Sequence, residues 1–183
     1  VIKLLSKFIF SILGWRIISK HPYPKKCVII AAPHTSNWDF FYGRCYAYIV
    51  GIKPYYLIKS ELFVPVIGWL LKVNGGIPVY RSSTNNFVDQ AAKKFQKRDN
   101  FILGMSPEGT RKRVERWKSG FYYIALKAQV PIIFVKIDYK TKEVGVFNQL
   151  QPSGDYKKDL LFIKEQFSSV SAKIPENYNT DIK

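Results

Sequence analysis

The feature that most constrains the fold is a repeated alternation of short apolar runs with longer segments of helical spacing. The apolar runs predict strands at 28–32, 55–58, 76–80, 101–105 and 130–137. Apolar residues recur at helical spacing in the intervening segments 37–50, 86–97 and 121–128. Strands that alternate with helices of this length predict an α/β fold. We therefore expect a mostly parallel or mixed twisted sheet with helices on both of its faces.

Other segments fit the same domain less regularly. Residues 143–147 are expected to form an edge strand, and residues 155–170 a terminal helix. The stretch 62–71 is apolar but is interrupted by Pro65 and Gly68. Because the sequence has no internal repeat and no low-complexity linker, we expect a single compact domain.

Residues 1–20 are expected to precede that domain, which then spans 21–183, as one amphipathic helix. This segment carries apolar and aromatic residues together with cations, namely Leu4, Leu5, Phe8, Ile12 and Trp15 with Lys3, Lys7, Arg16 and Lys20. The pattern predicts a helix that lies in a membrane interface. The alternative is a helix packed on the domain's own core. Because no stretch reaches the roughly 18 apolar residues of a spanning helix, membrane contact is expected at the surface.

A histidine and an aspartate directly follow the first predicted strand, in the segment 32–39 (APHTSNWD). Ser36 and Asp39 have the spacing of a capping box, which begins a helix. Asp39 then lies in the first helical turn, where its side chain can lean back and fix the tautomer of His34. This is a base with its orienting carboxylate and no nucleophile beside it, which suits an enzyme that activates a substrate hydroxyl. Taken alone, the same residues are also compatible with a structural histidine and a helix cap.

Two further segments put basic residues at the carboxyl ends of predicted strands. The segment 106–111 (SPEGTR) follows the fourth strand, and its proline and glycine predict a tight turn. The backbone amides of that turn, together with Arg111, would form a cradle for an anion such as phosphate. The segment 75–81 ends in Arg81 at the same edge of the sheet. Sites in such sheets gather at this edge.

The chain is strongly basic, with 29 Lys and Arg against 13 Asp and Glu and a formal net charge of +16. Such a field attracts nucleic acid, an anionic membrane, or acidic substrates and carrier proteins. A nucleic-acid-binding domain is the alternative from a different functional class, but no helix-turn-helix or zinc-finger pattern supports it. Cys27 and Cys45 have no metal-binding spacing and no neighbouring His–Asp pair, so neither a metal site nor a cysteine nucleophile is expected.

Together and in this order, these segments resemble the motifs of the glycerolipid acyltransferase family, the glycerol-3-phosphate and 1-acylglycerol-3-phosphate acyltransferases. Residues 34–39 are similar to the family's His-x4-Asp motif, and residues 106–111 to its Phe-Pro-Glu-Gly-Thr-Arg motif. Residues 76–81 resemble its second motif, and residues 130–135 its Val-Pro motif. A Lys-x-Glu-Leu segment that is often found between the first two motifs is also present, at 59–62.

The resemblance covers about residues 28–135 and implies an acyltransferase with an α/β fold that acts at a membrane. It implies that His34 is the general base and Asp39 its partner, and that the acceptor hydroxyl attacks a thioester directly. The implied acceptor-binding residues are Lys59, Arg81, Glu108, Gly109, Thr110 and Arg111. Among them, Arg81 and Arg111 are expected to bind a phosphate, and Glu108 to hold Arg111 or an acceptor hydroxyl.

No cofactor is expected, because the thioester of coenzyme A or of acyl carrier protein enters as a co-substrate. The expected partners are an anionic membrane surface, a lysophospholipid or glycerol-phosphate acceptor and an acidic acyl carrier protein, with no nucleic acid. We expect a peripheral position on the cytoplasmic face of a bacterial inner membrane, without a transmembrane span.

Three positions depart from the family pattern. Ser106 replaces the usual Phe, Pro33 stands where Asn commonly precedes the histidine, and Phe134 replaces a frequent second Pro. None of these changes removes a group that the chemistry needs, but they leave the acceptor open. The first expected acceptor is 1-acylglycerol-3-phosphate, and the alternative acceptor is another lysolipid or a lipid with an amine or amino-acid headgroup.

Overall fold

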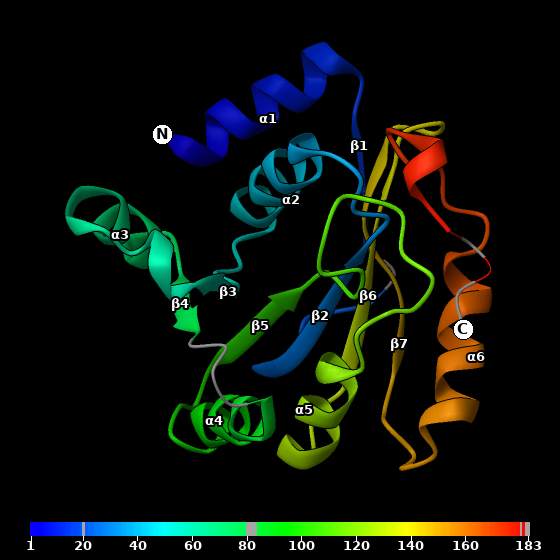
Figure 1. The fold of residues 1–183 in the computed structure, drawn as a ribbon. Helices are drawn as coiled ribbons and strands as arrows, with labels where there is room; N and C mark the ends of the chain where they lie inside the picture. Colours follow the sequence, from blue (N-terminus) through cyan, green and yellow to red (C-terminus); the bar gives the residue numbers. More distant parts are fainter. Residues whose placement is uncertain (20, 80–83, 180, 182–183) are drawn as a thin grey trace.

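A computed structural model describes residues 1–19, 21–79, 84–179 and 181 of the 183-residue chain. Within these residues, seven strands form one sheet in the order β1-β7-β6-β2-β5-β3-β4 (Figure 1). The strands β2 to β6 run parallel, whereas β7 is antiparallel to β6 and parallel to β1. The strands are β1 (Arg16–Ser19), β2 (Lys26–Ala32), β3 (Tyr55–Lys59), β4 (Gly76–Val79), β5 (Phe101–Met105), β6 (Ile132–Asp138) and β7 (Glu143–Leu150).

Helices cover both faces of this sheet, as the alternation of segments predicts (Figure 1). The helices within the described residues are α1 (Ile2–Leu13), α2 (Asn37–Val50), α3 (Pro65–Val73), α4 (Thr84–Gln96), α5 (Gly120–Ala128) and α6 (Tyr156–Phe167), with 3-10 turns at Ser60–Leu62 and Pro175–Asn177. α1 and α2 pack on one face, α4, α5 and α6 pack on the other, and α3 lies beside β4. The predicted single-domain α/β fold is confirmed.

Alternate side chains of the central strands belong to two separate hydrophobic cores, one on each face of the sheet. In β2, Val28 and Ile30 belong to the core shared with α4, α5 and α6, whereas Cys27 and Ile29 belong to the core shared with α1 and α2. Burying one such side chain is worth roughly 1.5–3 kcal/mol. Burial on both faces explains why the sequence of this strand is continuously apolar rather than alternating with polar residues.

The N-terminal prediction is wrong in its extent. α1 ends at Leu13, because Gly14 adopts a left-handed conformation with φ of 72° and its N–H caps the helix. Instead of continuing the helix to residue 20, Arg16–Ser19 joins the sheet as β1. The helical spacing of apolar residues therefore indicated the first half of the segment correctly and the second half incorrectly.

The position of β1 also corrects the prediction for residues 143–147. β1 pairs with β7, so β7 is not an edge strand. Gly145 permits this pairing, because a Cβ at that position would lie 1.6 Å from the carbonyl oxygen of Ile18. The pairing joins residues as far apart as Arg16 and Glu143, a separation that no local pattern reveals.

After α6 the chain runs back across the carboxyl edge of the sheet (Figure 1) as a segment that is irregular except for the 3-10 turn Pro175–Asn177. We call this segment, residues 168–179, the C-terminal strap. The hydroxyl of Tyr178 donates to the carbonyl of Phe167 at 3.0 Å. The guanidinium of Arg113 donates to the carbonyl of Tyr178 and to Oδ1 of Asn179, at 2.9 and 3.3 Å. The strap is thereby attached both to α6 and to the loop that follows β5.

Candidate active site

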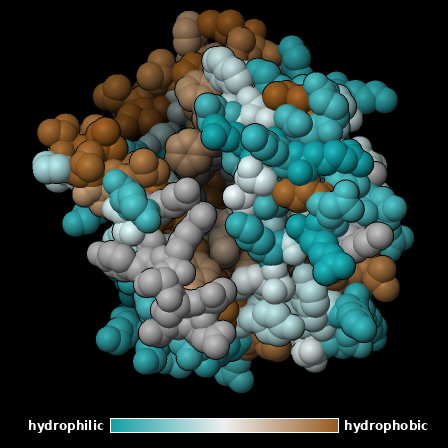
Figure 2. Space-filling view, in the orientation of Figure 1, coloured by the Kyte–Doolittle hydropathy of each residue, from teal (hydrophilic) through white to brown (hydrophobic). Residues whose placement is uncertain are grey.

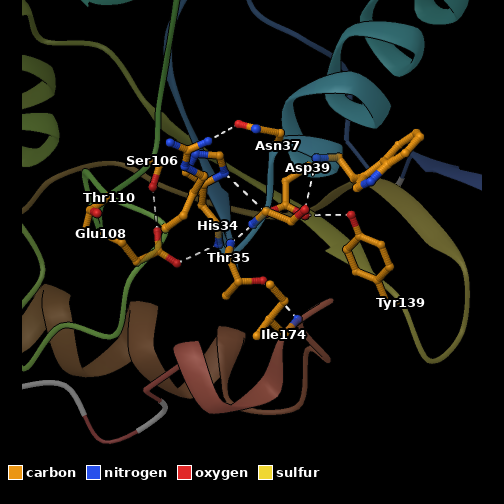
Figure 3. Close-up of polar contacts among 12 residues, drawn as sticks. His34, Thr35, Asn37, Asp39, Ser106, Glu108, Thr110, Tyr139 and Ile174 are labelled. Carbon is orange, nitrogen blue, oxygen red and sulfur yellow. Dashed lines mark hydrogen bonds and ion pairs between the residues drawn. The ribbon is translucent and has the colours of Figure 1, made fainter.

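Three loops converge at one edge of the sheet, because β2, β5 and β6 are parallel neighbours. The loop after β2 carries His34, the loop after β5 carries residues 106–111, and Tyr139 directly follows β6. Figure 3 shows these side chains turned toward one another. The sequence predicted that the first two loops share this edge, and that placement is confirmed.

His34 and Asp39 form the predicted pair at the start of α2. Ser36 is the N-cap, and its Oγ accepts a hydrogen bond from the Trp38 N–H at 3.2 Å. The capping box holds Asp39 in the first turn, where its Oδ2 lies 3.3 Å from Nδ1 of His34. The carboxylate is enclosed at 3% exposure, whereas the imidazole, at 26%, reaches solvent. Because Nδ1 faces the carboxylate, Nε2 is the nitrogen left for a substrate.

Asp39 accepts hydrogen bonds at both of its oxygens. The backbone N–H groups of Thr35 and Ser36 each donate to Oδ2 at 2.7 Å, and the hydroxyl of Tyr139 donates to Oδ1 at 2.6 Å. Burial acts to raise the pKa of Asp39, but the contact with His34 and these hydrogen bonds outweigh it and lower the pKa. Asp39 is therefore ionised at neutral pH, the form that orients an imidazole and stabilises its protonated state.

Glu108 makes two contacts that the sequence did not predict. Its Oε1 accepts from the backbone N–H of His34 at 2.9 Å, and its Oε2 accepts from the hydroxyl of Ser106 at 2.7 Å. At 4% exposure it is buried, and burial raises its pKa despite these hydrogen bonds. The predicted contact with Arg111 does not form, because the Arg111 guanidinium donates to Asn37 instead. A contact between Glu108 and an acceptor hydroxyl stays a prediction. Glu108 joins the loop after β5 to the backbone of His34.

The turn after β5 carries two cations near the start of α2. Gly109 has φ of 63°, and its N–H donates to the carbonyl of Ser106 at 3.1 Å, which closes the tight turn that the sequence predicts. Lys118 lies across this turn, since a Cβ on Gly109 would come within 2.8 Å of its Nζ. The guanidinium of Arg111 donates to Oδ1 of Asn37, the first residue of α2. Two exposed cations thus lie on the turn beside a helix N-terminus, an arrangement that attracts anions.

The structure describes the other predicted acceptor-binding residues to different extents. Thr110 is exposed, and its Oγ1 accepts from the Lys112 N–H at 3.4 Å. Lys59 ends β3 opposite Val79, the last residue of β4, so both strands end at the edge that holds His34. The side chain of Lys59 and all of Arg81 lie outside the described residues. Their part in binding stays a prediction.

The C-terminal strap adds contacts that the sequence analysis missed. The backbone N–H of Ile174 donates to Oγ1 of Thr35 at 3.2 Å (Figure 3). The ammonium of Lys173 lies 4.7 Å from the centre of the Trp38 ring and 5.8 Å from that of Tyr139. Tyr139 had one available signal, its position two residues after the predicted strand 130–137, at the carboxyl end of that strand. Lys118 and Lys173 had none, because only the fold brings them to the site.

Neither cysteine is placed to form a covalent intermediate. Cys27 and Cys45 are free and buried, as expected from their apolar surroundings. Burial raises the pKa of Cys27 to about 12 and also raises the pKa of Cys45. Because the thiolate is the nucleophilic form, both residues serve as parts of the core. Within the described ranges, no three His, Cys, Asp or Glu residues gather as a metal ion requires.

A contiguous apolar surface, which we call the α1–α3 surface, lies on the two helices nearest the top and left of Figure 1. Brown colour gathers over these helices in Figure 2, while teal covers most of the rest of that view. Ser6 and Phe10 are buried, so α1 packs on the core along one side and exposes apolar side chains along the other. No helix within the described ranges has the length and hydropathy to cross a bilayer. The exposed large apolar residues are Ile2, Leu4, Leu5, Phe8, Ile12 and Leu13 of α1 and Val66, Ile67, Trp69, Leu70 and Val73 of α3.

The sequence pattern of the family described as Acyltransferase matches residues 16–138, which include both the His34–Asp39 pair and the turn after β5. The chain therefore belongs to the acyltransferase family, and the resemblance seen in its motifs is confirmed.

Individual relatives agree with this assignment. A 1-acyl-sn-glycerol-3-phosphate acyltransferase of Saccharomyces cerevisiae is 27% identical over 161 residues, which cover 81% of this chain and 50% of the relative. A probable 1-acyl-sn-glycerol-3-phosphate acyltransferase of Mycoplasma pneumoniae is 31% identical over 144 residues, 73% of this chain and 53% of the relative. The chain thus spans about half the length of these curated relatives.

The fold also matches a solved structure. The crystal structure of the 1-acyl-sn-glycerophosphate (LPA) acyltransferase PlsC from Thermotoga maritima superposes with a TM-score of 0.61. The match covers 90% of this chain and 74% of that one at 20% sequence identity, so it supports the fold alone.

Proposed function

We propose that this protein transfers a fatty acyl group from a thioester to a hydroxyl of a glycerol-phosphate-type lipid, with 1-acylglycerol-3-phosphate as the acceptor. The observation that carries this proposal is the His34–Asp39 pair, 3.3 Å apart, beside the basic turn after β5. The pair supplies a base for an alcohol, and the turn supplies cations for a phosphate next to that alcohol. Two relatives with the corresponding name, from yeast and from Haemophilus influenzae, support this choice of acceptor.

The proposed reaction is a direct transfer. Nε2 of His34 takes the proton of the acceptor hydroxyl while that oxygen attacks the thioester carbonyl carbon. The carbon–sulfur bond then breaks, and the proton passes from His34 to the departing thiolate. Asp39 keeps Nδ1 protonated and stabilises the imidazolium that forms between the two steps. A positioned histidine contributes roughly 10²–10⁴-fold as a general base, which suits an alcohol that is scarcely ionised at neutral pH.

Arg111 and Lys118 are the described cations best placed for the acceptor phosphate. The fork of an arginine can contact two phosphate oxygens at once, whereas a lysine acts as a point charge. Lys59 and Arg81 complete the proposed acceptor site by resemblance to the family. Glu108 contributes indirectly, since it holds the backbone of His34 against this turn.

The α1–α3 surface supports a peripheral position on an anionic membrane, as does the net charge of +16. Large apolar side chains enter the headgroup region of a bilayer, and each nearby cation adds about 1 kcal/mol of attraction to an anionic surface. For a bacterial protein, the proposed location is the cytoplasmic face of the inner membrane. The same charge also suits an acidic acyl carrier protein as donor, beside acyl-coenzyme A.

The decisive experiment is a donor and acceptor screen with the 183-residue chain. The protein is incubated with acyl-coenzyme A or acyl carrier protein thioester and, in turn, 1-acylglycerol-3-phosphate, glycerol-3-phosphate, a lysophosphatidylcholine and an amino-acid-headed lysolipid. Lipid mass spectrometry identifies the product, and the His34→Ala variant is the control. We expect phosphatidate from the first acceptor. Product from another acceptor alone would overturn the acceptor, and no product from any would overturn the activity.

A further inference from the structure

Tyr139 lies beside the catalytic pair, although it belongs to none of the motifs. Its hydroxyl donates to Oδ1 of Asp39 at 2.6 Å, whereas Oδ2 is the oxygen that faces His34. Building on the proposed function, we propose that Tyr139 is a positioning residue, which holds the Asp39 carboxylate in the orientation that supports His34 as the base. In this role it acts through Asp39 and does not touch the substrate.

The two oxygens of Asp39 show why a separate donor is needed. The backbone N–H groups at the start of α2 bind Oδ2, the same oxygen that faces Nδ1 of His34. These bonds leave Oδ1, the second oxygen of a buried carboxylate, without a donor from α2, and a buried acceptor needs one. The hydroxyl of Tyr139, which follows a different strand, donates to Oδ1 and restrains the carboxylate from its other side, and the precision of a catalytic pair depends on such supporting contacts.

The position of Tyr139 is itself fixed by contacts with several elements. Its ring packs edge-on against Trp15 and Tyr42, with centroid distances of 5.2 and 6.0 Å. Its backbone N–H donates to the carbonyl of Ser171 in the C-terminal strap at 3.0 Å. The α1–β1 junction, α2 and the strap therefore all contribute to where the hydroxyl lies.

The charged groups around the Tyr139 hydroxyl determine how its removal would affect the protonation of His34. The titratable and charged groups that face Asp39 and Tyr139 are His34, Tyr42 and Lys173, and Glu108 lies beyond His34. Burial and the neighbouring carboxylate raise the pKa of Tyr139, so its hydroxyl is a proton donor across the neutral range. Without that hydroxyl, the Asp39 carboxylate accepts one hydrogen bond fewer. Its negative charge then attracts the protonated imidazole of His34 more strongly. The protonated form of His34 is then favoured, and it is inactive as a base.

The first test is the kinetics of Tyr139→Phe, which keeps the ring and removes only the hydroxyl. We expect kcat to fall about tenfold, the acceptor KM to stay within about twofold, and the acidic limb of the pH–rate profile to move to higher pH. Tyr42→Phe is the matched control, because it removes a hydroxyl from the same aromatic cluster without touching Asp39, and it should behave as wild type. A Tyr139→Phe protein with wild-type kcat and pH profile would overturn the proposal.

A double-mutant cycle separates this role from a purely structural one. If Tyr139 acts through the carboxylate, Tyr139→Phe should lower kcat by less than about twofold when Asp39→Asn is already present. Independent, multiplicative losses would assign Tyr139 to general packing and overturn the proposal.

A further readout needs no turnover. The chain has two histidines, His21 and His34, so ¹⁵N-labelled imidazoles give a spectrum that one His21→Gln variant assigns. The midpoint of the His34 titration should be higher in Tyr139→Phe than in wild type, and an unchanged midpoint would overturn the coupling. If the wild-type protein transferred no acyl group, the proposed function would fail, while this titration would still decide the role of Tyr139.

Discussion

The sheet edge that holds His34 and the α1–α3 surface are built in opposite ways. At the sheet edge, carboxylates are buried, and each is satisfied by donors from separate elements: Asp39 by α2 and the residue after β6, and Glu108 by the backbone of His34. On the α1–α3 surface, large apolar side chains face outward, with Phe8 and Trp69 at 62% and 64% exposure. One region hides polar groups and the other displays apolar ones.

This difference separates contacts that are complete within the isolated protein from contacts that form only with something outside it. A buried carboxylate without donors is costly, so the bonds of Asp39 and Glu108 must be complete in the isolated protein. An exposed apolar surface gains its favourable energy only when something outside the protein covers it. Substitutions at the sheet edge should therefore change the rate, whereas substitutions on the α1–α3 surface should change attachment.

The largest expected effect is at the base itself. His34→Ala should lower acyl transfer at least about 10²-fold, because no other described group is placed to accept the proton of the acceptor. Thermal stability should be unchanged, because the imidazole is partly exposed. Vesicle binding should also be unchanged, because His34 does not belong to the α1–α3 surface. Thiol release measures acyl transfer, thermal melts measure stability and sedimentation measures vesicle binding, and His21→Ala is the matched control. Near-normal turnover by a folded His34→Ala protein would contradict the mechanism.

The second effect concerns the phosphate. Arg111→Ala should raise the acceptor KM by the equivalent of about 1.5–3 kcal/mol, the strength of a charge-assisted hydrogen bond. Arg111→Lys should restore binding only in part, because the bidentate fork is lost. Lys112→Ala, an exposed neighbour in the same loop, is the control, and Arg81→Ala tests the second predicted phosphate ligand. If both Arg→Ala variants kept the wild-type acceptor KM, the anion site would have to lie elsewhere.

The third prediction uses pH. Asp39→Asn should lower the free energy of unfolding by about 1–2 kcal/mol at neutral pH. The folded state holds the pKa of Asp39 below the value of about 3.9 found in unfolded chains. Its charge therefore stabilises the fold above that value, and the contribution disappears as the pH falls through the lower, folded-state pKa. Urea unfolding of both proteins between pH 7 and pH 3 should show the difference narrowing, and a constant difference would contradict the assignment.

The smallest expected effect is on the α1–α3 surface. Leu5→Glu or Phe8→Glu should weaken sedimentation with anionic vesicles about fivefold, and added salt should weaken the binding of the wild type as well. Leu161→Glu on α6 is the matched control, because Leu161 is 66% exposed but lies on another helix. Turnover of a soluble short-chain acceptor should be unaffected. A lower melting temperature with unchanged vesicle affinity would show that these side chains serve the fold instead.

The sequence predicts elements best where their signals are local. The bounds of α2, Asn37–Val50, follow from the cap residue Ser36 and from Gly51 after the last turn, and the structure agrees with them residue for residue. The bounds of β5, Phe101–Met105, agree equally well. Both elements carry their own start and stop signals within a few residues.

The sequence fails where a role depends on a distant partner. β1 is only four residues long, and its sequence continues the apolar spacing of the helix before it. The motif marks Glu108 as important, but not that it bonds the backbone of His34 rather than Arg111. Tyr139 acquires its contact with Asp39 only because β6 is placed beside β2.

The direct passage from α1 into β1 has a mechanical consequence. If α1 is embedded in a bilayer, any pull from the moving membrane reaches the domain along the length of β1. The four residues of β1 are paired in parallel with β7, so such a pull stretches their hydrogen bonds together, in shear, rather than opening them one after another. Trp15 lies at this junction and packs against Tyr42 and edge-on against Tyr139. A load on α1 that exceeded the strength of the β1–β7 pairing would therefore first disturb the ring whose hydroxyl holds Asp39.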